Sequence, residues 1–274
     1  MSVRKAAVAG QFYPGRPAEL RSTVEQYLNQ TRVDPAPEKT VAVVAPHAGY
    51  VFSGPTAGFA YARVRGKKPK RVILLGCSHY YGVTGASVSD AGSFETPLGA
   101  FAVDTPFAQT LAKETGSRPA APHTEEHALE VQLPFLGVAL GEVLIVPVLF
   151  GGPASDWHAQ MGKKLAEMAD DTDLVVASTD LSHYLNSERA HQLDKTTLDK
   201  ILTKDCTALV NGLGAGSCSL CGGAAVVAAM AFALARGAES WSILDYRISA
   251  ETSGDYDRVV GYAAISMERR DDDG

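Results

Sequence analysis

The sequence predicts an α/β fold: a single domain with a mostly parallel central sheet and helices on both faces, in three layers. Short apolar runs alternate along the chain with longer segments whose apolar residues recur at helical spacing. The short runs are apolar throughout, as strands buried on both faces of a parallel sheet should be. With 274 residues, the chain is long enough for one large core of this kind.

Apolar runs, several of them rich in β-branched residues, are the expected strands. Two of these runs lie on either side of Pro147. The strands that we expect are residues 41–44, 71–75, 143–146, 148–150, 174–177, 242–249 and 259–267.

Helices are expected between these strands. Pro17 suits the first turn of a helix, and Thr124 can cap a helix that begins at Glu125. The helices that we expect are residues 17–28, 125–131, 154–168, 187–202 and 222–235.

Residues 1–267 are expected to form the single α/β domain. The connector at residues 31–40 contains prolines but is too short to separate two domains. Residues 268–274 are almost all charged, and we expect a frayed C-terminal tail there.

The composition is that of an ordinary globular protein, with 46% hydrophobic residues and a net charge of -6. The densest basic run, residues 63–71, is expected to be a solvated helix end and turn, so no nucleic-acid surface is predicted. We see no secretory signal and no apolar run of the ~18 residues that span a membrane. We therefore expect a cytoplasmic protein.

Three histidines, His47, His79 and His183, follow expected strands directly. In an open parallel sheet, ligands bind beyond the carboxyl ends of the strands. A single loop histidine is most often a surface or hydrogen-bonded residue. Three of them at equivalent positions predict one shared crevice.

Four cysteines, in a cytoplasmic protein, favour free thiols or metal ligands over a disulfide framework. Cys221 opens an expected helix, whose N-terminus would favour the metal-binding thiolate, although a buried apolar role is equally open. Cys218 and Cys221 have the spacing of a redox motif, a weak signal without a second pair. Cys77 is expected to point away from His79 and to pack in the core.

His127 and Glu130 are three residues apart on an expected helix and can therefore face the same way. An ordinary pair in the first turn of a helix is the alternative. No comparable context surrounds His123, His158 and His191, which we expect at the surface.

Several segments resemble the Memo-like protein family, in family order and over most of the chain. The matching segments are residues 10–14, 45–50, 52–54, 78–79, 126–130, 133–134, 178–184 and 221–222.

The Memo-like family is similar in fold to the class III extradiol ring-cleaving dioxygenases, which hold non-haem Fe(II) by two histidines and a glutamate. The resemblance implies that His47 and His79 are metal ligands and that His183 is the acid/base residue. Cys221 falls where the dioxygenases have their glutamate, which weakens the case for ring cleavage. Asp180 could orient a neighbouring imidazole. The implied cofactor is one transition-metal ion: Fe(II) first, with copper or zinc also accepted by a softer set.

These residues support a metal-dependent oxidoreductase in which His183 moves a proton and an unknown substrate binds nearby. We expect His127, Glu130, Phe12, Tyr50 and Phe52 to line or support the pocket.

The alternative is a non-catalytic adaptor that holds a peptide or a small molecule in the same pocket. Hydrolysis by zinc-activated water ranks last, because no zinc-protease motif is present. The resemblance also implies a radical-SAM protein and a small partner domain as partners. The sequence leaves the oligomeric state open.

Overall fold

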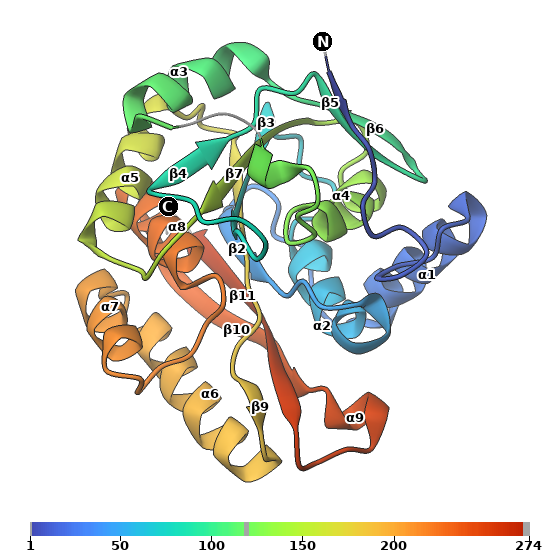
Figure 1. Cartoon of the computed structure of the whole chain (residues 1–274), viewed down its shortest axis with the longest axis vertical. Coiled ribbons are helices and arrows are strands. Elements are labelled where there is room, and N and C mark those ends of the chain that lie inside the picture. Colours follow the sequence, from blue (N-terminus) through green and yellow to red (C-terminus); the bar gives the residue numbers. More distant parts are fainter. Residues whose placement is uncertain (1, 118–120, 271–274) are drawn as a thin grey trace.

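The computed structural model describes residues 2–117 and 121–270. Its main sheet has the strand order β10-β11-β2-β8-β3-β7-β4, with β9 paired to β11 (Figure 1). The four neighbouring strands at its centre run parallel to one another. These central strands are β2 (Thr40–Ala45), β8 (Leu174–Ser178), β3 (Arg71–Cys77) and β7 (Leu144–Phe150).

The outer strands of this sheet run antiparallel to their neighbours, so the expectation of a mostly parallel sheet is wrong for the sheet as a whole. A short connection joins β10 to β11, and such a connection can return the chain only in the opposite direction. The outer strands are β10 (Ala238–Ile248), β11 (Val259–Arg269), β4 (Ala86–Val88) and β9 (His183–Leu185).

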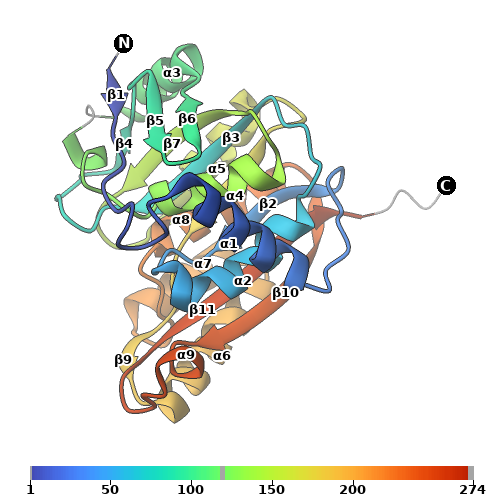
Figure 2. The same cartoon turned by 90° about the vertical axis from the view of Figure 1, so that its right-hand side faces the viewer.

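A second, three-stranded sheet has the order β1-β5-β6 and lies beside β7, near the N-terminus (Figure 2). Its strands are β1 (Val3–Arg4), β5 (Ser93–Thr96) and β6 (Gly99–Ala102). We did not expect this sheet, because its strands are too short to show an apolar run.

Both faces of the central sheet are covered. Ile73, Leu74 and Leu75 follow one another in β3 and are all fully buried, and successive side chains of a strand point to opposite faces. In Figure 1, α5, α7 and α8 lie on one side of the sheet and α1 and α2 on the other. The finer three-layer stacking stays a prediction.

The helices of the described residues follow the expected order, with additions. They are α1 (Pro17–Gln30), α2 (Tyr50–Arg63), α3 (Thr105–Thr115), α4 (Leu133–Ala139), α5 (Asp156–Met168), α6 (Ser187–Leu202), α7 (Cys206–Gly214), α8 (Gly223–Ala235) and α9 (Ala250–Ser253).

Helix α2 was not expected, because Gly54, Pro55 and Gly58 lie inside it and such residues normally interrupt a helix. The two glycines have a packing role instead. A Cβ atom at Gly58 would lie 2.7 Å from the backbone oxygen of Tyr27, so glycine lets α1 and α2 approach closely.

The helix expected at residues 125–131 does not form. Residues 124–125 form a bend, 126–127 have no regular structure, 128–129 form a turn, a single 3-10 turn covers Glu130–Gln132, and α4 starts at Leu133. The carboxylate of Glu126 accepts the N–H of Ala128 at 2.9 Å. A side chain that bonds nearby backbone in this way competes with the helical hydrogen bonds.

Part of the segment that we assigned to the C-terminal tail is a strand. β11 continues through Arg269, and Glu268 makes an ion pair with Arg63, with 2.5 Å between the carboxylate oxygen and Nε. This pair and the pairing with β10 hold the end of the strand in place. Residues 271–274 lie outside the described residues.

Within the described residues, no helix combines the length and the apolar character needed to cross a bilayer.

Replacing Gly162 of α5 with alanine should destabilise the fold. The new Cβ atom would lie 2.1 Å from the backbone oxygen of Ala228 in α8, so the two helices would have to move apart. We expect the free energy of unfolding to fall by about 1–3 kcal/mol, the usual cost of overpacking. Denaturant unfolding measures it.

Gly214→Ala is the matched control, because a Cβ atom there meets no atom within 4 Å. It should leave stability within about 1 kcal/mol of the parent, since alanine favours a helix over glycine by that amount. Equal losses in both variants would contradict the close approach of α5 and α8.

Candidate metal centre

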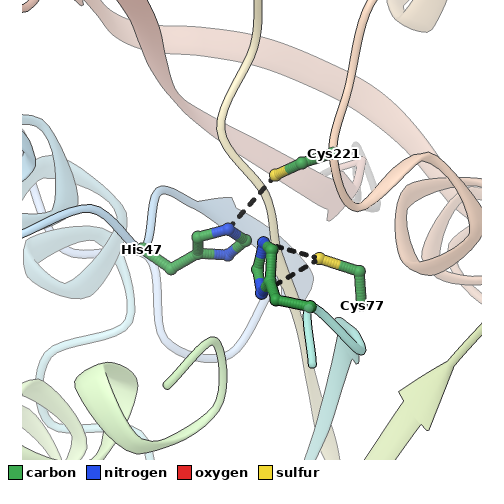
Figure 3. Close-up of side chains that lie close together, drawn as sticks. His47, Cys77 and Cys221 are labelled. Carbon is green, nitrogen blue, oxygen red and sulfur yellow. Dashed lines mark hydrogen bonds between the residues drawn. The ribbon is translucent and has the colours of Figure 1, made fainter. Parts of the chain in front are cut away.

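The candidate site lies beyond the carboxyl ends of β2 and β3. His47 comes two residues after β2, His79 two residues after β3, and Cys221 two residues before α8. These residues and Cys77 each offer a donor atom, and the four donor atoms lie within 4.8 Å of one another. Figure 3 shows the labelled His47, Cys77 and Cys221 side chains gathered around one small space. The fold therefore brings together the donor atoms of the three residues expected from the sequence and places Cys77 beside them.

Hydrogen bonds fix the orientation of the His47 ring. The hydroxyl of Ser178 donates to the carbonyl oxygen of Ala128 at 2.6 Å, and its oxygen accepts from Gln132 at 2.8 Å. Because the Ser178 hydroxyl has already donated its one proton, its oxygen can only accept, and His47 Nδ1 donates to it at 2.9 Å. In the neutral ring, this bond leaves the lone pair on Nε2, which lies 3.1 Å from the sulfur of Cys221.

Asp180 connects the two strand ends to Cys221. Its buried carboxylate accepts the backbone N–H of His47 at 2.8 Å. Its own N–H points to the sulfur of Cys221 at 3.1 Å, and the N–H of Cys221 donates to its carbonyl oxygen at 3.2 Å. Burial raises the pKa of this carboxyl group, against the effect of the charge on His47. Asp180 thus positions the backbone of His47, whereas Ser178 orients its ring.

Glu126 does both tasks for His79. Its buried carboxylate accepts from His79 Nδ1 at 2.8 Å and from the His79 backbone N–H at 2.6 Å. Burial would raise the pKa of Glu126, but the hydrogen bonds from His79 and Ala128 outweigh it and lower that pKa to about 2. The second nitrogen of His79, Nε2, lies 3.5 Å from the sulfur of Cys77.

The metal-free site favours charged ligands. Burial would raise the pKa of the Cys221 thiol, but the hydrogen bond from Cys77 and the charge on His47 hold it well below its usual range. Burial would lower the pKa of His47, yet the charges on Cys221 and Asp180 raise it to about 9. The pKa of His79 is raised to about 10, because hydrogen bonds to Cys221 and Glu126 outweigh burial. The lowered pKa of Cys221 favours the thiolate, the form that binds metal.

Cys77 was wrongly expected to point away from the site. Side chains two residues apart in an extended segment face the same side, so Cys77 and His79 point the same way, and the Cys77 sulfur lies 3.5 Å from His79 Nε2. Its pKa is raised by the hydrogen bond to Cys221 and by burial, so the two sulfurs differ in protonation.

His127 lies against the metal centre rather than on a helix. Its ring stacks on that of His79, with 4.5 Å between centroids, and Phe12 contacts its other side at 4.7 Å. Burial and the charge on His47 lower the pKa of His127 to about 4, so the ring is neutral. His79, Glu126 and His127 also form a second group whose donor atoms lie within 4.8 Å of one another.

Glu130 has a different role from the one expected. Its fully buried carboxylate is ion-paired with Arg4, and it accepts the backbone N–H groups of Ala7 at 2.7 Å and Val8 at 3.1 Å. It anchors the N-terminal segment. The helix that would have aligned it with His127 does not form, which explains the difference.

His183 contributes no atom to either donor group found among the described residues. Its Nδ1 donates to the carbonyl oxygen of Leu181 at 2.9 Å, which leaves Nε2 as the basic nitrogen. Its charge acts on the pKa of Asp180, which places it on the Asp180 side of the cluster.

Two of the expected aromatic pocket residues lie elsewhere. Tyr50 is buried, and its hydroxyl donates to the carbonyl oxygen of Val131 at 2.6 Å, so it belongs to the core. Phe52, two residues further along the chain, is 36% exposed. Phe12 alone of the three has a ring contact with a histidine of the site among the described residues.

Sequence reasoning missed Cys77, Glu126, Ser178 and Gln132. Glu126 directly precedes His127, and Ser178 opens the segment that contains Asp180 and His183, so both stood inside motifs already singled out. Their roles depend on contacts between distant segments, which spacing along the chain does not show.

A cavity of about 310 Å³ adjoins Cys221. It is bordered by residues 152–154, by the segment from Leu213 to Leu220 and by the start of α8. A larger hollow of about 800 Å³ lies between β6, the end of α4 and the start of β7 and includes none of the cluster residues. We consider the smaller cavity the one relevant to the site, because Cys221 borders it.

Comparison with known proteins gives consistent matches. The sequence model of the Memo-like protein family matches residues 4–266. A MEMO1 family protein of Methanopyrus kandleri is 35% identical over 281 residues, covering 97% of this chain and 99% of the relative. One of Nitrosopumilus maritimus is 34% identical over 275 residues, with coverage of 97% and 99%.

Among solved structures, an uncharacterized protein from Escherichia coli K12 superimposes with a TM-score of 0.55 at 14% identity. The match covers 83% of this chain and 99% of that one. At this identity, the likeness concerns the fold alone.

The lowered pKa of Cys221 predicts that its alkylation by iodoacetamide in metal-free protein rises less steeply with pH, between about pH 6 and pH 8, than that of an ordinary thiol. Cys206 is the internal control, because burial raises its pKa. Its rate should rise about tenfold per pH unit over the same range, since the thiolate fraction does. Mass spectrometry of the two peptides gives both rates, and parallel pH profiles would contradict the charge state assigned to Cys221.

Proposed function

The chain belongs to the Memo-like family, and we propose that it is a mononuclear metal-binding protein with His47, His79 and Cys221 as ligands. One observation carries the proposal: donor atoms from separate segments, with Cys77 beside them, lie within 4.8 Å of one another. This spacing lets one ion contact all of them.

The orientation of the imidazoles supports the proposal. In both His47 and His79, Nδ1 is held by a hydrogen bond to a buried oxygen, from Ser178 or Glu126. Metal-binding histidines are typically held in this way, because the outer bond fixes the ring and its tautomer. The Nε2 atoms are left facing the sulfur atoms of Cys221 and Cys77.

The donor set favours a soft ion. The four-residue group contains two imidazoles and two sulfurs, and thiolates favour Cu(I) and Zn(II) over Fe(II). The nearby carboxylates of Asp180 and Glu126 accept hydrogen bonds from His47 and His79. We therefore propose Cu(I) as the first candidate, ahead of Fe(II), the first expectation from the family resemblance.

An oxidoreductase activity is the reaction class that we propose for this centre. A bound metal would supply electron transfer or Lewis-acid chemistry there. In His183, Nδ1 is held by the carbonyl oxygen of Leu181, and Nε2 takes no part in that bond. We propose that His183 moves a proton through Nε2. The cavity beside Cys221 would receive a small substrate.

One observation favours the alternative of a non-catalytic adaptor. Tyr80 and Tyr81 follow His79 directly and are 54% and 41% exposed. Exposed aromatic rings beside a crevice suit peptide or small-ligand binding. Turnover of any substrate by the metal-loaded protein would exclude the purely binding role. The radical-SAM protein and the small partner domain stay predictions.

Titration of the metal-free chain with Cu(I), against a competing chelator, should give one ion per chain. The His47→Ala, His79→Ala double variant and Cys221→Ser should each weaken binding by more than about tenfold, because a ligand is removed. His191→Ala and Cys206→Ser are matched controls outside the cluster and should bind like the parent. Undiminished binding in the double variant would exclude the proposed site.

Glu126→Gln should weaken metal binding about 10–100-fold, the usual effect of changing the partner that orients a ligand. The amide keeps the size of the side chain but can no longer balance the charge on His79. The same titration measures it, with a thermal melt to show that the variant folds. Glu125→Gln, at the more exposed neighbouring position, is the control and should have no effect on affinity.

A further inference from the structure

Cys77 and Cys221 are distant in sequence, yet their sulfur atoms share the same small volume. Cys77 ends β3 and Cys221 lies just before α8, and both sulfurs belong to the group whose donor atoms are within 4.8 Å of one another. Both are free thiols and are only partly buried. Figure 3 shows the two labelled side chains directed toward the same space.

We propose that Cys77 and Cys221 form a reversible disulfide when the metal-free protein meets a hydroperoxide, and that this bond closes the site to metal. The inference rests in part on the proposed function, because its second half concerns metal binding. The first half concerns only the two sulfurs.

The required movement is small. Sulfur atoms in a disulfide are ~2 Å apart, so sulfurs that lie within 4.8 Å must approach by at most about 3 Å. Cys221 lies in the loop between α7, which ends at Gly214, and α8, which begins at Gly223. The bond from the Cys221 N–H to Asp180 can stay in place while the side chain rotates.

The reaction balances with one peroxide as oxidant. With hydrogen peroxide as the oxidant, the Cys221 sulfur attacks as its thiolate, one peroxide oxygen is transferred to it as the O–O bond breaks, and a sulfenic acid forms. The departing hydroxide takes up the proton that the Cys221 thiol released and becomes one water. The Cys77 sulfur then attacks the Cys221 sulfur, and the S–O bond breaks. The leaving hydroxide takes the Cys77 proton and becomes a second water. In sum, two thiols are oxidised to one disulfide and the peroxide is reduced to two waters.

The structure favours Cys77 over Cys218 as the partner, although Cys218 has the spacing of a redox motif with Cys221. Cys218 is 4% exposed, and its N–H donates to the carbonyl oxygen of Gly212 at 3.1 Å. Its sulfur packs against Gly212, 2.7 Å from where a Cβ atom there would be. It is absent from the groups of donor atoms found among the described residues.

The disulfide and the metal compete for the same atoms. Oxidation would remove both sulfurs from the donor set and leave two imidazoles, a much weaker set for a soft ion. A bound ion would in turn hold the sulfurs and protect them from peroxide. Such a pair makes metal binding depend on the redox state of the surroundings.

The first test treats the full metal-free chain with hydrogen peroxide and maps its peptides without reduction. We expect a cross-linked peptide pair containing residues 77 and 221, the loss of two free thiols, and recovery of both with dithiothreitol. Cys77→Ser should give no cross-link and should instead accumulate sulfinic acid on Cys221. Cys206→Ser and Cys218→Ser are the controls and should keep the cross-link.

A wild-type cross-link between residues 218 and 221, or sulfinic acid on Cys221 despite an intact Cys77, would overturn the proposal. The serine variants also show whether a lost cross-link reflects misfolding, because thermal melts of Cys77→Ser and Cys218→Ser can be compared.

The second test uses Zn(II), a probe that is not itself redox-active. After peroxide is removed, the oxidised chain should bind Zn(II) at least about tenfold more weakly than the reduced chain, and dithiothreitol should restore the affinity. A cross-link without metal binding in the reduced chain would contradict the proposed function and leave the disulfide standing. Metal binding without a cross-link would contradict the disulfide alone.

Discussion

The geometry of the site depends on Asp180, which joins three segments through a few buried hydrogen bonds. β2 and β8 run side by side in parallel, with Ala45 opposite Ser178, so His47 and Asp180 emerge next to each other. The Asp180 carboxylate then accepts the His47 N–H, while its own backbone bonds Cys221. Burying a carboxylate is costly unless it is paired or hydrogen-bonded. Here that requirement fixes where an imidazole and a thiolate meet.

Glu126 supports His79 as Asp180 supports His47, and burying its carboxylate carries a similar cost in free energy. Its carboxylate is buried, and it accepts hydrogen bonds from the ring and backbone of His79 and from Ala128. These bonds replace the helix that the sequence pattern indicates around residue 126. Where the pattern indicates a helix, the Glu126 carboxylate instead bonds the nearby Ala128 N–H and a histidine that follows another strand.

The sequence was sufficient to place His47 and His79 in one crevice, because strand ends of a parallel sheet share an edge and both residues directly follow apolar runs. Cys77 was also within reach of the sequence, because residues two apart in an extended segment face the same side and Cys77 lies two residues before His79. The sequence was insufficient for Glu130, whose predicted alignment with His127 required a helix. The antiparallel outer strands were missed for a related reason. An apolar run shows that a strand is buried but carries no information about its direction.

The presence of two sulfurs rather than one changes how the site should be understood. With one thiolate and two imidazoles, the ligand set would only select the metal. With Cys77 beside Cys221, the same sulfur atoms are near enough to serve the proposed ion or the proposed disulfide. The imidazoles are held by Ser178 and Glu126 through bonds that do not involve the sulfurs. Under the proposed function, half of the donor set would therefore stay oriented whichever partner the sulfurs take.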